Sequence, residues 1–298
     1  MEDLARIEAR LESLDELGEL VGALRSMAAA RAREAQDALV GTRAYSSIIE
    51  RAIASVAPAA SLEAATGSGG RPVLLLIASE NGFVGGFNAR MSAVARQARS
   101  PDERLMIVGR RGEIAAMEDG LSAERSFAMT SRVGGIGALA RRVTACLSDV
   151  HSARIAFARH QSGARYAPVV RQVLPLVPIS EPASGPAPTP LFHLSPDALI
   201  AALAREYLFA EIAHALMESL ASENAARMQA MDAASRNIDD RLEMLKAHER
   251  AARQEKTTSD MLDVVTGAEA VNQRPEPSAG MEQKGRNQAE QGGNHQCK

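Results

Sequence analysis

Apolar residues recur at intervals of three or four positions along the first part of the chain, from Leu4 to Ala28. This spacing places them on one face of a helix and predicts a single helix over residues 2–57. The small residues of Ala28–Ala32 would let a neighbouring backbone come close to that helix. A linker is expected at 59–71, because its Gly- and Ser-rich stretch does not continue a helix.

A second long helix is predicted towards the other end of the chain. Ser195 is a favourable cap and Pro196 a favourable first-turn residue, and no further Pro or Gly occurs before Gly267. At 1.5 Å per residue, the roughly 69 residues of 197–265 make a helix of about 100 Å. A helix of that length does not fit inside a compact domain. It must therefore pair with another long helix or pass through a partner.

The middle of the chain alternates between apolar runs of strand length and stretches with helical spacing. The expected strands are 73–77, 105–108, 154–157 and 169–177, and the expected helices are 89–99, 111–118 and 135–150. Such alternation predicts a mostly parallel sheet that is covered by helices on both faces.

The expected fold class is α/β, with a long antiparallel coiled coil of the N- and C-terminal helices flanking a small Rossmann-like α/β domain. Many apolar positions of the helices are Ala or Met, so the seam between them is expected to be thin. The expected parts are an N-terminal helix (1–58), the linker (59–71), the α/β domain with a Pro-rich loop (72–190), a C-terminal helix (191–271) and a disordered polar tail (272–298).

Composition narrows the possible functions. The chain has 298 residues, a net charge of −3, 3% aromatic residues and no Trp, which argues against a nucleic-acid partner. Cys146 and Cys297 are isolated, as expected in a reducing compartment. No apolar run approaches the roughly 18 residues of a membrane span, and the acidic N-terminus lacks a signal-peptide pattern. A soluble or peripheral protein without direct membrane insertion is expected.

One glycine motif resembles a dinucleotide-binding fingerprint. Gly135, Gly137 and Ala140 match the G-x-G-x-x-A spacing, but this motif should follow a strand and precede an acidic residue by about 20 positions. The preceding segment, 125–130, looks like a poor strand, and no acid lies at that distance. We therefore expect the glycines to serve the fold.

Enzyme chemistry finds little support. A nucleotide-binding P-loop needs Lys directly after Gly, and none of the four lysines follows a Gly. The six histidines show no metal-ligand spacing. No catalytic, cofactor or metal site is expected. Four acidic residues of the C-terminal helix are expected on a solvated or partner-facing side rather than as a carboxylate pair for acid–base catalysis. They are Glu206, Glu211, Glu218 and Glu223.

A Gly-rich turn follows the first predicted strand, with the sequence SENGFVGGFN at 79–88. A turn of this kind can serve the fold alone, or it can hold a phosphate at a helix N-terminus. We favour the structural alternative and expect Asn88 to cap the following helix. The residues of interest are Gly82, Gly85, Gly86, Phe87 and Asn88.

Two segments resemble the gamma subunit of F-type ATP synthases. The turn at 79–88 is similar to the SDRGLCGGFN turn of that family, and ESLASENAARMQAM at 218–231 is similar to its ESxASEHAARMxAM signature. Ala252-Arg253-Gln254 and the stretch 264–271 continue the likeness, and 23–31 is a weaker echo of AMKMVAAAK. The resemblance covers about residues 4–271.

The resemblance implies a torque-transmitting rotor subunit rather than an enzyme. Its partners would be the alpha and beta subunits of a catalytic hexamer, an epsilon subunit and the membrane c-ring, at the cytoplasmic face of the cell membrane. The resemblance implies no cofactor. The implied hexamer contacts are Leu24, Arg25, Met27, Arg253, Gln254 and Thr258. The implied ring contacts are Phe192, His193 and Ser195.

Some segments depart from the family pattern. The family's N-terminal helix is basic where this chain reads LESLDELGELV at 11–21, which indicates a divergent branch with its own matched partners. Two alternatives stay open: a nucleotide-binding enzyme with helical oligomerisation arms, and a coiled-coil scaffold.

Overall fold

The computed structural model describes residues 4–60, 69–161, 165–176 and 193–272. The chain divides into two compact units, Ala9–Met244 and a smaller one of residues 1–8 with 245–298. The expected tail beyond Asn272 and most of the Pro-rich loop lie outside the described residues.

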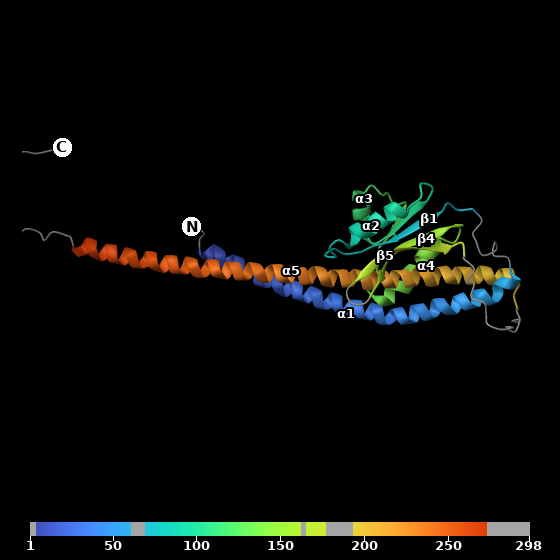
Figure 1. Cartoon of the computed structure of the whole chain (residues 1–298), viewed down its shortest axis with the longest axis horizontal. Coiled ribbons are helices and arrows are strands. Elements are labelled where there is room, and N and C mark those ends of the chain that lie inside the picture. The colour runs from blue at the N-terminus through green and yellow to red at the C-terminus, as the bar shows by residue number, and fades with distance from the viewer. Residues whose placement is uncertain (1–3, 61–68, 162–164, 177–192, 273–298) are drawn as a thin grey trace, which may run out of the picture. The chain divides into compact units, whose positions relative to one another are not determined.

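Both long helices are present (Figure 1). Helix α1 is Leu4–Val56 and ends in a short 3₁₀ turn, Ala57–Ala59, at the first Pro of the chain. Helix α5 is Pro196–Asn272, with 77 residues. The Ser195 hydroxyl accepts a hydrogen bond from the Ala198 N–H at 3.3 Å, which confirms the predicted start of α5.

Within the larger unit the two helices run antiparallel, as predicted. As the residue numbers along α1 increase, the residue numbers of their contact partners on α5 decrease. The pairs are Gly18 with Ile238, Arg25 with Asp232, Thr42 with His214, and Tyr45 with Glu206.

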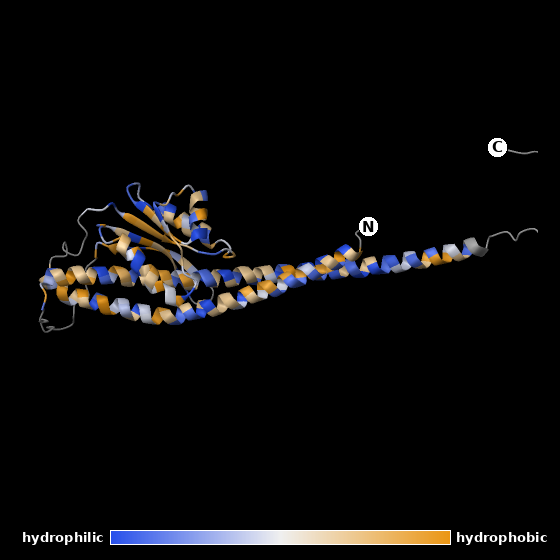
Figure 2. Cartoon of the chain, turned by 180° about the vertical axis from the view of Figure 1, so that it is seen from behind, coloured by the Kyte–Doolittle hydropathy of each residue, from blue (hydrophilic) through white to orange (hydrophobic). Residues whose placement is uncertain are grey.

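The seam between the helices is thin, also as predicted. Val21 packs with Met231 and Ile238 in a small buried cluster. Farther along α1, Ala28 and Ala35 are fully buried, and their small size allows close approach. Figure 2 shows hydrophobic and hydrophilic residues interleaved along both helices.

In the described part of the chain, five strands form one sheet in the order β3-β2-β1-β4-β5. The strands are β1 Val73–Ile77, β2 Arg104–Val108, β3 Arg125–Phe127, β4 Ala153–His160 and β5 Tyr166–Leu174. The first four are parallel and β5 is antiparallel to β4. This confirms the mostly parallel sheet and its Rossmann-like order.

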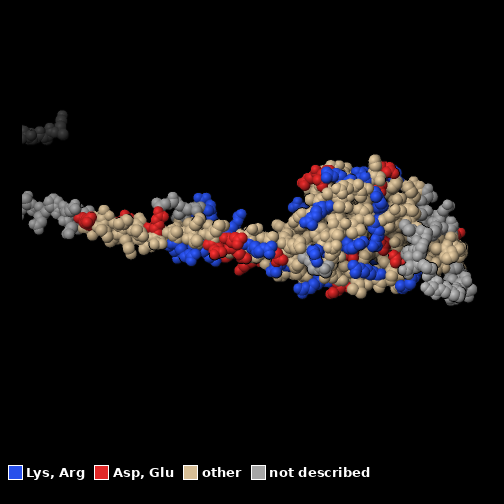
Figure 3. Space-filling model, viewed as in Figure 1, with Lys and Arg blue, Asp and Glu red and all other residues tan. Residues whose placement is uncertain are grey.

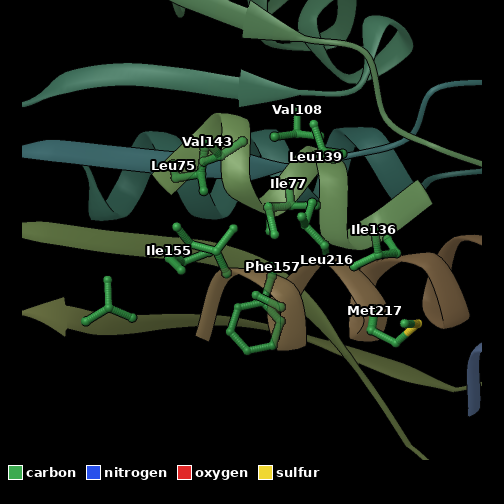
Figure 4. Packing of buried hydrophobic residues seen from close by; sticks show 14 of the residues in the cluster. Leu75, Ile77, Val108, Ile136, Leu139, Val143, Ile155, Phe157, Leu216 and Met217 are labelled. Atoms are coloured by element: carbon green, nitrogen blue, oxygen red, sulfur yellow. The ribbon is translucent and has the colours of Figure 1, made fainter. Parts of the chain in front are cut away.

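Helices cover both faces of the sheet. Alternate residues of β1 point to opposite sides, so Leu74 packs towards α2 (Phe87–Ala98) and α3 (Arg110–Glu118), whereas Leu75 packs towards α4 (Ile136–Cys146) and α5. Figure 4 shows the second core, in which Ile155 and Phe157 of β4 meet Leu216 of α5. The C-terminal helix therefore closes one face of the α/β domain.

One expectation about the strands was wrong. The segment 125–130 contains β3, which pairs with β2 at the sheet edge. Only Phe127 of its three residues is buried, so the strand lacks an apolar run that would reveal it. The glycine motif after it serves the fold, because a Cβ on Gly135 would lie 2.4 Å from the Thr130 hydroxyl.

A buried ion pair fastens β4 to the turn before β2. Arg154 Nε donates to Glu103 Oε1 at 2.8 Å, and the Glu103 side chain is 5% exposed. Burial alone would raise the pKa of Glu103. The hydrogen bonds from Arg154 and from the Ser100 N–H, with the charges of Arg154 and Arg99, lower it below its ordinary 4.5.

We expect Glu103→Gln to lower the free energy of unfolding by about 2–4 kcal/mol at pH 7, because Arg154 loses its partner. A lowered carboxyl pKa stabilises the fold above pH 4.5 and less so as the pH falls through that value. The difference between variant and wild type should therefore shrink below pH 4.5. Denaturant unfolding at several pH values measures it, and a constant difference would contradict the prediction.

Candidate functional site

Helix α5 fills the place where an open α/β sheet ordinarily binds a ligand. Such a crevice opens at the carboxyl ends of the strands where the strand order reverses, here between β1 and β4. Side chains of α5 reach both sides of this point. Ser219 meets β4, and Arg227 meets the loop after β1. A helix therefore lies where a dinucleotide would bind. This argues against the alternative of a nucleotide-binding enzyme.

Ser219 and Ser222 of α5 form hydrogen bonds with the end of β4, where β1 no longer pairs with it. The register between β1 and β4 ends at Leu76 opposite Ala156, and β4 continues to His160. The Ser219 hydroxyl accepts from the Ala158 N–H at 3.2 Å, and the Ser222 hydroxyl donates to the Ala158 carbonyl at 3.0 Å. These buried backbone groups are thereby satisfied.

Glu206, Glu211, Glu218 and Glu223 were expected on a solvated or partner-facing side of α5, and for the last three this expectation was wrong. Glu211, Glu218 and Glu223 are 1–4% exposed. Each pairs with an arginine, respectively Arg171 of β5, Arg43 of α1 and Arg227 of α5 itself. Glu206 is half-buried and accepts from the Tyr45 hydroxyl. The helical spacing gave no sign of the partners of Glu211 and Glu218, because these come from the sheet and from α1.

Glu218 lies at the centre of these contacts. Its carboxylate accepts from Arg43 Nη2 and from the His160 backbone N–H, each at 2.7 Å. His214 Nε2 is 3.6 Å away. Burial lowers the pKa of His214 and of His160, and the positive charge of Arg43 adds to this against the pull of Glu218. Both rings are therefore neutral near pH 7.

The turn at 79–88 is closed by its own side chains. The Asn88 side chain accepts from the Ser79 N–H at 3.1 Å and donates to the Ser79 hydroxyl at 2.8 Å. Asn88 is therefore not the cap of α2; Gly86 holds that position. Gly85 has a φ of +55°, which favours glycine, and Phe87 is fully buried beneath the turn.

The tip of this turn lines a pocket of about 140 Å³ against the two long helices. Its walls include Leu24 and Met27 from α1, Gly82 and Phe83 from the turn, and Arg227 from α5. The structure thus brings together two of the predicted site groups. Phe83 is 70% exposed and has a φ of +60°, which is rare for a bulky residue and marks local strain.

Arg227 lines this pocket and bonds α5 to the turn. Its guanidinium donates to Glu223 Oε1 at 2.6 Å, to Asn224 Oδ1 at 3.1 Å and to the Gly82 carbonyl at 3.3 Å. Burial raises the pKa of Glu223, and the charge of Arg227 opposes that rise. Arg25 projects from α1 with its side chain 56% exposed and is paired with Asp232.

The remaining predicted contact residues of α5 belong to the smaller unit. Arg253 Nη2 lies 2.9 Å from Glu8 Oε1 and 2.7 Å from Glu249 Oε1, with its side chain 59% exposed. Gln254 is exposed, and its carbonyl accepts from the Thr258 hydroxyl at 2.9 Å. All three are therefore available on the surface of this unit.

Of the predicted ring contacts, His193 and Ser195 are exposed just before α5, and Phe192 lies outside the described residues. Sequence reasoning missed Phe83 and Asn224 as pocket residues, and Arg43 and His214 as partners of Glu218. The run of polar residues in the 218–227 signature, on a helix that must also cover a sheet, was a signal that Glu218 has buried partners.

Within the described ranges, no cluster of His, Cys, Asp or Glu could hold a metal. None of the described helices has the length and apolar character needed to span a bilayer.

Comparison with known proteins covers nearly the whole chain. A family model described as ATP synthase matches residues 3–271. The ATP synthase gamma chain of Fuscovulum blasticum is 30% identical over 291 residues, which cover 91% of this chain and 100% of that one. The ATP synthase gamma chain of Anaeromyxobacter sp. is 27% identical, with the same coverage of both chains.

Solved structures share the fold. A chain of the Euglena gracilis mitochondrial ATP synthase, in an assembly of OSCP, F1 and c-ring, aligns with a TM-score of 0.61 at 14% identity. That alignment covers 94% of this chain and 99% of the other. A chain of the rotor of the same synthase aligns with a TM-score of 0.58, covering 85% and 98%.

Proposed function

Because the chain belongs to the gamma-chain family of F-type ATP synthases, as a central-stalk subunit, we propose that it transmits torque between a membrane c-ring and a catalytic alpha–beta hexamer. The observation that carries this is the family match over 3–271 together with a 77-residue helix that pairs antiparallel with α1. In this role the chain couples ion transport to ATP synthesis or hydrolysis. It works at the cytoplasmic face of the membrane and is itself not a catalyst.

Two surfaces are proposed to meet the hexamer. One is the stretch of α1 with Leu24, Arg25 and Met27, where Leu24 and the exposed Met27 line the pocket and the Arg25 side chain is exposed beside them. The other is Arg253 with Gln254 and Thr258 on the exposed side of α5. An arginine suits such a contact because its planar fork binds a carboxylate with two hydrogen bonds.

The α/β domain is proposed to face the c-ring and an epsilon subunit. Between residues 72 and 176 the chain has 14 arginines and 8 acidic residues, although its net charge is −3. Basic side chains are spread over the face of the domain that Figure 3 shows. We therefore expect the partner surfaces that meet this domain to be acidic, with His193 and Ser195 at the contact with the ring.

The isolated chain is expected to bind no ATP tightly and to have no ATPase activity. The reason is that no Lys follows a Gly, so no P-loop exists, and α5 fills the crevice of the sheet. Isothermal titration with MgATP, together with a phosphate-release assay, measures both properties. Sub-micromolar binding would instead favour the nucleotide-binding alternative.

Reconstitution tests the proposed function itself. The chain should co-purify with the alpha and beta subunits encoded in the same genome, and the complex in membrane vesicles should pump ions when it hydrolyses ATP. Omitting this chain should abolish pumping. An alpha–beta–ring complex that assembles and pumps equally well without it would overturn the proposal.

A further inference from the structure

The turn of α5 from Glu218 to Ser222 is bonded to both long-helix and sheet neighbours. Ser219 and Ser222 hold Ala158 of β4, and Glu218 holds the His160 N–H. The same Glu218 carboxylate binds Arg43 of α1. A single buried side chain therefore connects α1, α5 and the central sheet.

These bonds differ in kind from the apolar contacts around them. Leu216, Leu220 and Ala221 pack against the sheet, but apolar burial is non-directional and tolerates small rotations. A hydrogen bond weakens steeply when its angle changes. Glu218, Ser219 and Ser222 are 0–2% exposed, so water cannot readily replace one of their bonds to β4 when it is pulled out of line.

We propose that Arg43, His160, Glu218, Ser219 and Ser222 form a joint that fixes the rotational setting of the α/β domain on the two long helices, with Glu218 as its central positioning residue. This inference rests on the proposed rotor function. Torque applied to the α/β domain must pass into α1 and α5. The joint bears it where buried side chains of α5 make directed bonds to β4 and to the partly exposed Arg43 of α1.

The first measurement uses the full isolated chain. Glu218→Gln keeps the size of the side chain but removes its charge, so it cannot hold Arg43 and the His160 N–H equally well. We expect hydrogen exchange at the His160 amide to become at least about tenfold faster, with the amides of β1 unchanged. The control is Glu124→Gln, which removes an Arg–Glu pair of the same domain that makes no contact with the joint. Unchanged exchange at His160 would overturn the inference.

The second measurement uses the complete complex in membrane vesicles. Glu218→Gln and Ser219→Ala should each lower the ions pumped per ATP hydrolysed several-fold, while hydrolysis itself changes little. Arg43→Lys, which keeps the cation, should restore most of the ratio that Arg43→Gln loses. Glu124→Gln should match wild type.

The outcomes separate the two proposals. A normal pumping ratio in Glu218→Gln and Ser219→Ala complexes, beside a wild-type complex that pumps, would overturn the joint and leave the rotor function intact. A wild-type complex that hydrolyses ATP without pumping would overturn the rotor function and the joint with it.

Discussion

Arg253→Ala is expected to lower ATP hydrolysis by the assembled complex several-fold while leaving the chain folded. In the isolated chain Arg253 is paired with Glu8 and Glu249 on an exposed surface, and such pairs contribute at most about 1 kcal/mol to stability. At the proposed contact with the hexamer, the same guanidinium would lose its water. A charge-assisted contact of that kind costs roughly 2–5 kcal/mol when one partner is truncated.

The measurement is steady-state hydrolysis by purified complex, with assembly confirmed by subunit composition. Arg253→Lys tests the fork geometry, because it keeps the charge but not the two parallel donors. Arg286→Ala, beyond residue 272 in the sequence and outside all proposed contacts, should have no effect. Normal turnover and coupling by the Arg253→Ala complex would contradict the prediction and show that Arg253 is an ordinary solvated residue.

Arg227→Ala is expected to have the opposite profile, with a large loss of stability in the isolated chain. Its guanidinium is the cation beside Glu223, whose side chain is 5% exposed. Removing it leaves a buried carboxylate without a counter-charge, which costs about 3–5 kcal/mol. The carbonyl of Gly82 also loses a donor, so the turn should become more mobile at the pocket rim.

Thermal and denaturant unfolding of the full chain measure this loss. For a unit of this size, 3–5 kcal/mol corresponds to a drop in Tm of roughly 6–20 °C. Replacing both partners, as in Arg227→Met with Glu223→Met, should recover most of the stability because no buried charge is left unpaired. Arg25→Ala, whose pair with Asp232 is more exposed, should change stability by less than about 1 kcal/mol. A double variant no more stable than Arg227→Ala would contradict this account.

Local patterns in the sequence determined the elements of this protein. The spacing of apolar residues and the absence of Pro and Gly predicted two long helices, and continuous apolar runs predicted the buried strands. These signals are strong because a helix or a buried strand must repeat its apolar positions at its own period. β3 had no such signal, since an edge strand with one buried residue needs no apolar run.

Tertiary structure alone decided what the polar residues of α5 do. Glu211, Glu218 and Glu223 looked like a solvated face, because a helical pattern shows which residues share a side but not what lies opposite them. The partners of Glu211 and Glu218, which are Arg171 and Arg43, come from segments 40 and 175 positions away. Burying a carboxylate is favourable only when such a partner arrives, and that depends on how α1 and β5 are placed against α5. The sequence by itself thus determined the helices, the buried strands and the family. Folding alone determined that the glutamates are internal fasteners and that Leu24, Met27 and Gly82 share one pocket.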